Sequence, residues 1–225
     1  MADSRHAARL VMLVSTAVFI NYVDRGNLST AATLVQEQLS LNEAQLGILF
    51  SAFYYGYVPL MPLMGVIAER YDCRRIFMVS MAMFMAVSVT WGYLFGTDTI
   101  EVWHAVVLLT VHGLAGAIFS PASQLILHDL VKADRLASAV RLTATSRQLG
   151  ILMGPAIGGF LLVALGPAWG IAANAVFYLP VIAWSLKEPY TGHADIGGPR
   201  KIGNVGWGIG MAIDTLREAS ANRTI

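Results

Sequence analysis

The chain has 225 residues, of which 56% are hydrophobic and only 13% are charged. Soluble domains usually carry about 25% charged residues, so this composition excludes an ordinary soluble domain and predicts a membrane protein. A formal net charge of +1 gives no support for nucleic-acid binding. The single cysteine, Cys73, excludes a framework of intramolecular disulfides.

Apolar runs of about 20 residues, the length that crosses a bilayer as a helix, recur along the chain. We predict six spans, over residues 10–34, 46–68, 76–95, 102–127, 137–165 and 168–186. Pro59 and Pro62 are expected to kink the second span. The expected fold class is all-α, a polytopic membrane protein with six transmembrane helices in residues 1–186. Residues 187–225 are expected to form a cytoplasmic linker segment.

Lysine and arginine residues lie in alternate connections between the predicted spans. The connections at residues 36–43, 96–101 and 166–167 contain neither residue type. Because loops rich in lysine and arginine stay on the cytoplasmic side, both termini are predicted to be cytoplasmic. The expected location is the plasma (inner) membrane.

The link between the second and third predicted spans is short and densely charged. Between residues 65 and 75 it contains Gly65, Glu69, Arg70, Arg74 and Arg75. The glycine permits close approach of a neighbouring helix, and the charges can pair with a helix end and release it. This combination predicts a gate.

The first span carries adjacent ionisable residues, Asp24 and Arg25. The apolar run before them is about 14 residues, too short to cross a bilayer alone, so the helix is expected to continue past both. Ionisable groups at such depth usually face a cavity or a partner and mark substrate or proton pathways. The alternative is that both side chains extend to the outer interface.

Helical spacing places Asn21 and Tyr22 on the same face as Arg25. An arginine beside a phenol and an amide is a candidate receptor for a carboxylate or phosphate. Adjacent helical residues point about 100° apart, so Asp24 need not neutralise Arg25. A low dielectric would favour protonated Asp24, which makes it a candidate proton carrier. His112 is a second proton-coupling candidate, although a histidine bonded to a neighbouring helix fits the same sequence.

The fifth span contains small residues and a proline at regular spacing: Gly150, Gly154, Pro155, Gly158 and Gly159. Small residues at this spacing permit close helix contact, and the proline bends the axis. The pattern predicts a packing or hinge device without chemistry of its own. Arg147, just before it, is expected either to line the inner mouth of a cavity or to reach the cytoplasm.

The charged link at residues 65–75 resembles the signature loop of the major facilitator superfamily, G-x-L-a-D-R-x-G-R-[KR]. Glu69 stands where that family usually has aspartate, and Asp72 where it has a second glycine. The resemblance implies one N-terminal six-helix half of a twelve-helix transporter, with the substrate between two halves near the midplane. The second half would come from the same chain or from another subunit.

Two narrower resemblances favour different branches of that superfamily. Asn21-Tyr22-x-Asp24-Arg25-x-Asn27-Leu28-Ser29, with Gly47, Phe53 and Tyr57 after it, is similar to the anion:cation symporter family. In that family the first-helix arginine contacts the organic anion, and the aspartate takes part in proton coupling. Residues 120–159, with Trp169 and Asn174, resemble the exporter branch that includes siderophore effluxers. Proton symport of a small organic anion and proton antiport of a drug- or siderophore-like compound therefore both stay open.

Other classes of membrane protein fit less well. An intramembrane serine protease needs an activated serine, but no Gly-x-Ser-x-Gly occurs and the sixth span has no histidine. His104 and His112 lack carboxylate or thiolate partners for a metal site. A non-transporting, truncated membrane protein is the third alternative. We expect no catalytic residue, metal or cofactor, and as partners a small anion, protons and the lipid bilayer.

Overall fold

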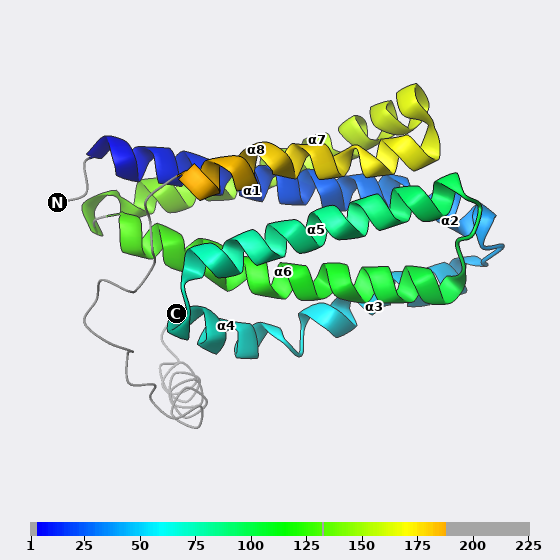
Figure 1. Ribbon diagram of the computed structural model, residues 1–225, viewed down its shortest axis with the longest axis horizontal. Coiled ribbons are helices and arrows are strands. Elements are labelled where there is room, and N and C mark those ends of the chain that lie inside the picture. The colour runs from blue at the N-terminus through cyan, green and yellow to red at the C-terminus, as the bar shows by residue number, and fades with distance from the viewer. Residues whose placement is uncertain (1–3, 132, 188–225) are drawn as a thin grey trace, which may run out of the picture. The chain divides into compact units, whose positions relative to one another are not determined.

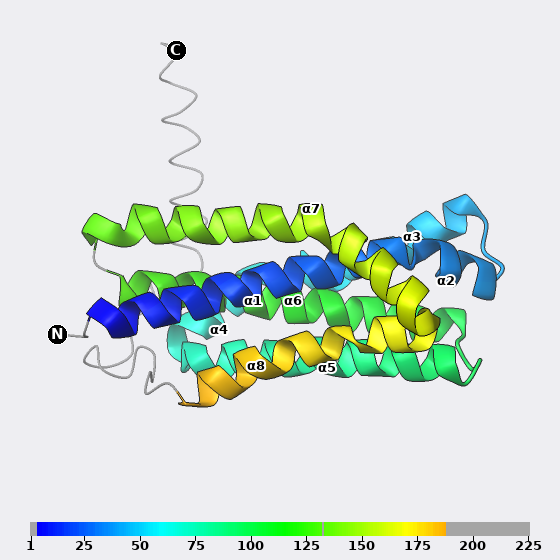
Figure 2. The ribbon, with the colours of Figure 1, turned by 90° about the horizontal axis from the view of Figure 1, so that it is seen from above.

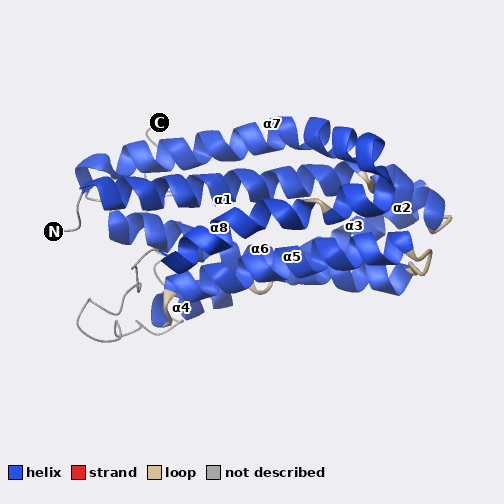
Figure 3. Ribbon diagram, turned by 45° about the horizontal axis from the view of Figure 1, so that its top comes forward, coloured by secondary structure: helices blue, strands red, loops and turns tan. Residues whose placement is uncertain are grey.

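The computed structural model describes residues 4–131 and 133–187, and the regular structure in these ranges is helical throughout. Figure 3 shows these residues as a bundle of helices joined by short loops. The helices are α1 (Ser4–Thr30), α2 (Ala32–Gln38), α3 (Glu43–Tyr57), α4 (Met61–Arg70), α5 (Cys73–Gly96), α6 (Val102–Leu130), α7 (Ala133–Ala172) and α8 (Asn174–Lys187). The predicted all-α fold class is confirmed. Most of the predicted linker, residues 188–225, lies outside the described ranges.

Within the described ranges, five helical segments are long and apolar enough to cross a membrane: Ala7–Thr30, Glu43–Gly65, Cys73–Gly96, Val102–Asp129 and Arg135–Ala172. The sixth predicted span, residues 168–186, is divided between the end of α7 and the 14-residue α8. Gly166 has a φ of 78°, a left-handed conformation that reverses the chain inside α7. The sixth span therefore exists as a returning segment and not as one uninterrupted helix.

The second predicted span is bent, as its prolines indicate. Helix α3 ends at Tyr57 and α4 begins at Met61. Pro59 and Pro62 carry no backbone N–H, so regular helical hydrogen bonding cannot continue through this segment. Both parts still run in the same general direction, which keeps one span (Figure 1).

The helix ends alternate between two ends of the bundle (Figures 1 and 2). The start of α1, the α4–α5 link, the α6–α7 link and the end of α8 lie at one end. The α2–α3 link, the α5–α6 link and the reversal inside α7 lie at the other. The connections without lysine or arginine are therefore together, as an alternating membrane topology requires.

A stripe of glycines brings α7 against α1. A methyl group at Gly150 would lie 2.8 Å from Cβ of Tyr22, and one at Gly158 would lie 2.8 Å from Cα of Asn27. Gly154 faces Gly26, where Pro155 also approaches. A methyl group at Gly159 would meet only the Thr30 methyl group, at 3.9 Å, so Gly159 stands beside this contact. Close helix approach here depends on the missing side chains.

Two apolar clusters fill the bundle, and a polar layer separates them. The first includes Val14, Phe77, Phe84 and Tyr178, and the second includes Val35, Leu49, Trp91, Leu109 and Ile171. Asp24, Ser88, His112 and Asn174 are buried at the level between the clusters. Each comes from a different helix, α1, α5, α6 and α8, so this layer joins four helices.

Candidate functional site

Asp24 is the centre of the buried polar layer. The residue is 4% exposed, and its carboxylate accepts hydrogen bonds from Nδ2 of Asn174 and from the hydroxyl of Tyr178, both at 2.9 Å. The Ser88 hydroxyl lies 3.5 Å from Oδ1 of Asp24. Asn27 donates in turn to the amide oxygen of Asn174. The carboxylate on α1 is therefore tied to α8, with a weaker contact to α5.

His112 lies next to this centre, as the predicted proton-coupling pair requires. Its Nε2 is 3.8 Å from Oδ2 of Asp24, which is too long for a hydrogen bond. Phe84 and Phe53 pack on the imidazole with ring centroids at 4.9 and 5.7 Å. The structure thus brings the two predicted residues together without a direct hydrogen bond between them.

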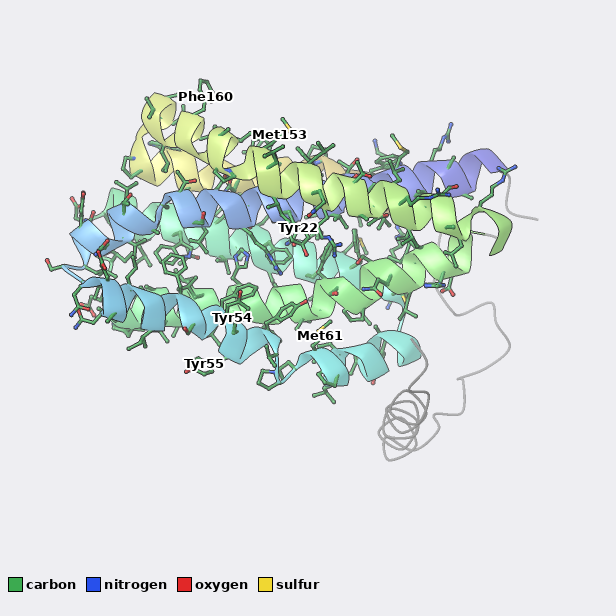
Figure 4. All side chains as sticks on the ribbon, turned by 180° about the vertical axis from the view of Figure 1, so that it is seen from behind. Tyr22, Tyr54, Tyr55, Met61, Met153 and Phe160 are labelled. Carbon is green, nitrogen blue, oxygen red and sulfur yellow. The ribbon has the colours of Figure 1, made fainter. Side chains whose placement is uncertain are left out.

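Arg25 faces a different environment. Together with Asn21 and Tyr22 it lines a cavity of about 350 Å³ between α1, α3, α6 and α7. The three residues predicted to bind substrate therefore share one cavity. Figure 4 shows Tyr22 inside the bundle, whereas Tyr55 and Phe160 point outward. The alternative in which Asp24 and Arg25 both extend to the outer interface does not fit these positions.

Three aromatic rings surround the Arg25 guanidinium. Its central carbon is 4.8 Å from the ring centroid of Phe53, 5.2 Å from Tyr22 and 5.6 Å from Tyr57. Gly116 on α6 makes room for it, because a methyl group there would lie 2.8 Å from Nη2. Rings attract a cation without cancelling its charge, so the guanidinium keeps its positive charge for another partner.

The cavity is positively charged. Arg25 and Arg147 both line it, and none of the described residues along its wall is acidic. Hydrogen-bonding groups on the wall include Ser120, Ser123, Gln124 and Thr143. Of the two positions expected for Arg147, the structure shows the one at the cavity wall. Such a wall can bind an anion that also carries polar groups.

The predicted gate residues occupy the α4–α5 junction. Gly65 lies in α4, with open space where a side chain would be, and α4 ends at Arg70. Asp72 caps α5 by accepting from the backbone N–H groups of Arg74 and Arg75, at 2.9 and 3.4 Å. Arg74 donates to the carbonyl of Leu186 at 2.8 Å, near the end of α8. The side chains of Glu69 and Arg70 lie outside what the structure describes.

Several residues of the site were missed in the sequence or noted only through a resemblance. Asn174 and Tyr178 hold the Asp24 carboxylate, and Phe53 and Tyr57 enclose Arg25. The available signal was spacing: both pairs stand four residues apart, which places each pair on one helix face. Within the described residues, no group of three or more histidine, cysteine or acidic side chains is arranged to hold a metal ion.

Comparison with solved structures supports the fold. A bacterial homologue of the human lysosomal transporter Spinster, solved in an inward-facing and unoccupied conformation, superposes with a TM-score of 0.71. The sequences are 17% identical, and the match covers 89% of this chain and 47% of that one. At this identity the likeness concerns the fold alone.

Comparison with curated proteins finds relatives about twice as long. The Hexuronate transporter of Bacillus subtilis (strain 168) is 24% identical over 184 residues, 81% of this chain and 42% of that protein. The "Probable sulfoacetate transporter SauU" of Cupriavidus necator is 31% identical over 169 residues, 75% of this chain and 37% of that protein. MdtD of Klebsiella pneumoniae (strain 342), whose name refers to multidrug resistance, is 24% identical over 72% of this chain and 33% of its own length. The chain therefore spans less than half the length of these relatives.

A match to a family sequence model agrees with the helical bundle and its candidate gate loop. The sequence model of the Major Facilitator Superfamily matches residues 14–220, which is most of the chain. The relatives above are named as transporters or for drug resistance, and none of them is named as an enzyme. The chain belongs to the Major Facilitator Superfamily, a family of membrane transporters and not of enzymes.

Proposed function

We propose that this chain is the N-terminal half of a proton-coupled carrier for a small organic anion. The observation that carries the proposal is the Arg25 guanidinium, held by aromatic rings at a cavity without acidic residues on its described wall. Arginine pairs well with a carboxylate, sulfonate or phosphate because its planar donors match two oxygens of such a group. An anion at this site would meet charge and hydrogen-bond donors together.

The cavity suits a small solute. Its volume of about 350 Å³ lies at the lower end of the range for small-molecule pockets, about 300–1,000 Å³. Asn21 and Ser120 offer polar groups beside the charged end, and Phe119 and Leu127 supply apolar surface. A compound with one anionic group and a few polar substituents fits this wall better than a large apolar drug.

Asp24 is the proposed proton-coupling residue. It lies one position from Arg25, yet it faces the buried polar layer and not the cavity. Its partners Asn174 and Tyr178 are both on α8, so gain or loss of a proton at Asp24 would change how α8 is held. Carriers that alternate between two faces of a membrane need such a link between a proton site and helix position.

A second six-helix half completes the proposed carrier, from the same polypeptide or from another subunit. The outward surfaces of α3 and α7 carry large apolar side chains, among them Tyr55 at 70% and Phe160 at 71% exposure. Such surfaces suit lipid or the partner half. The positive residues at the α4–α5 end favour a cytoplasmic position for both termini in the plasma membrane.

The names of the relatives refer to two classes of transported compound. Hexuronate and sulfoacetate are anions, which agrees with the cavity. The multidrug name of MdtD agrees instead with proton-driven efflux of a drug- or siderophore-like compound. The positive cavity favours the anion, and the binding test below distinguishes the two ligand classes.

The test is equilibrium binding by the purified chain in lipid nanodiscs. Glucuronate and sulfoacetate are compared with an uncharged amphiphile, using the wild type and the variants Arg25→Ala and Arg25→Lys. We expect anion affinity to fall at least 100-fold in Arg25→Ala, a loss of about 3 kcal/mol, and less in Arg25→Lys. Unchanged anion binding in Arg25→Ala, or binding of the amphiphile alone, would contradict the proposal.

Transport needs a separate measurement. Counterflow of labelled anion in vesicles distinguishes a carrier from a membrane protein that only binds. We expect counterflow when the second half is present and no efficient uphill uptake by a strictly monomeric preparation of this chain. Robust uphill uptake by that monomer would contradict the role given to the second half.

A further inference from the structure

A second, much smaller void lies against Asp24. Its volume is about 10 Å³, and its wall includes Asp24, Asn27, Trp91, His112 and Asn174. None of its lining residues also lines the large cavity at Arg25. The void therefore belongs to the buried polar layer and is separate from the proposed anion site.

Three residues of this wall each carry a polar atom that lacks a hydrogen-bond partner among the described residues: Oδ1 of Asn27, Nε1 of Trp91 and Nε2 of His112. The three residues are 5%, 2% and 2% exposed. A buried polar atom without a partner destabilises the fold, and native proteins pair nearly all such atoms. Three residues with an unpaired polar atom around one void indicate that the void holds a common partner.

We infer that this void is a binding site for a single water molecule, which links Asp24 to Trp91, His112 and Asn27. The volume matches that of about one water. A water accepts from the Trp91 indole N–H and donates to the oxygens of Asn27 and Asp24. Its second lone pair accepts from Nε2 of His112 in the ring tautomer that carries hydrogen on this nitrogen, because both water hydrogens are already donated. All three unpaired atoms are then satisfied.

A metal cation fits the same wall less well. Asp24, Asn27 and Ser88 offer oxygen atoms of the kind that sodium prefers. The indole nitrogen of Trp91, however, is a donor only, and its hydrogen would face the cation. Water satisfies this donor and the oxygens together, so the chemistry of the wall selects water.

A water at this position would also affect proton coupling in the carrier, and this consequence alone rests on the proposed function. Nε2 of His112 and Oδ2 of Asp24 are 3.8 Å apart and do not bond directly. A water in the void connects them, so the proposed proton site includes His112 and Trp91 as positioning residues. Neither residue lines the anion cavity.

The test detects the water at the Trp91 indole. The full chain, with nitrogen-15 in its tryptophan indoles, is placed in lipid nanodiscs, and magnetisation transfer from water to each indole proton is measured. We expect the Trp91 signal to show a cross-peak with the sign of a long-lived bound water. Trp169, which is 74% exposed on the outer surface, is the control for transient contact with solvent or lipid.

The Trp91 signal is assigned by its loss in Trp91→Phe. If that variant does not fold, replacement of the other four tryptophans by phenylalanine leaves Trp91 as the single indole. Absence of the cross-peak would mean a dry void and overturn the inference. A Trp91 shift when sodium chloride replaces choline chloride would mean a cation and also overturn it. Neither readout depends on anion binding, so this inference and the proposed function can fail separately.

Discussion

Asp24 and Arg25 are neighbours on α1, but they lie in opposite kinds of surroundings. Asp24 is 4% exposed and held by two hydrogen bonds from α8. Arg25 is half-buried beside an open cavity and has aromatic rings around it in place of a carboxylate. The turn of about 100° between adjacent helical residues produces this separation.

This separation allows one helix to serve two ligands, a proton and an anion. A charge whose hydrogen bonds are satisfied inside the protein is part of the structure, and its loss should cost stability. A charge enclosed by rings but not neutralised remains available, and its loss should cost binding. Each prediction below tests one side of this division.

Removal of the Asp24 carboxylate should have the largest effect on stability. In Asp24→Ala, Asn174 and Tyr178 lose their acceptor, and we expect the free energy of unfolding to fall by about 3 kcal/mol. Arg25→Ala should lower it by only about 1 kcal/mol, because it loses ring contacts alone. The free energy of unfolding of both variants is measured in mixed micelles. Equal losses in the two variants would remove the distinction between the two faces of α1.

Loss of the Tyr178 hydroxyl should have the next largest effect. Tyr178→Phe keeps the ring that stacks on Phe84 but removes the donor to Asp24. A hydrogen bond to a charged group contributes about 1.5–3 kcal/mol, and we expect a loss near the lower end. Tyr54→Phe is the matched control, because Tyr54 is 61% exposed on α3. A Tyr178→Phe chain as stable as the control would show that α8 is not held through Asp24.

The parts of this comparison that a sequence can predict are those decided within one helix. Asn21, Tyr22, Asp24 and Arg25 lie close together along α1, and helical spacing alone assigns their faces. The kink at Pro59 and Pro62 is likewise local. These predictions needed no knowledge of which helices are neighbours.

The partners from distant helices could not be predicted in the same way. Asn174 and Tyr178 are about 150 residues beyond Asp24, and which face of α8 meets α1 depends on the whole bundle. The division of the sixth span was missed for a related reason. The reversal at Gly166 falls in the predicted connection at residues 166–167, but an apolar run gives no sign that α8 begins only at Asn174.

On the Arg25 side, Gly116→Ala should weaken anion binding moderately. The added methyl group would lie 2.8 Å from Nη2 of Arg25, so the guanidinium must move within the cavity. We expect about a fivefold loss of affinity, or about 1 kcal/mol, with little change in stability because a flexible side chain can shift. Gly159→Ala is the control, since its methyl group meets only an ordinary contact. Equal affinity in the two variants would count against Arg25 as the anion contact.

The smallest effect concerns the rings themselves. Tyr57→Leu removes one ring from the Arg25 enclosure, and a single cation–π contact contributes about 0.5–1 kcal/mol, so anion affinity should fall twofold to fivefold. Tyr57→Phe keeps the ring and should bind nearly as tightly as the wild type. If Tyr57→Phe binds the anion as weakly as Tyr57→Leu, the hydroxyl contributes to affinity and the ring does not. If Tyr57→Leu binds the anion as tightly as the wild type, the rings do not orient Arg25, and the charge of the cavity alone accounts for binding.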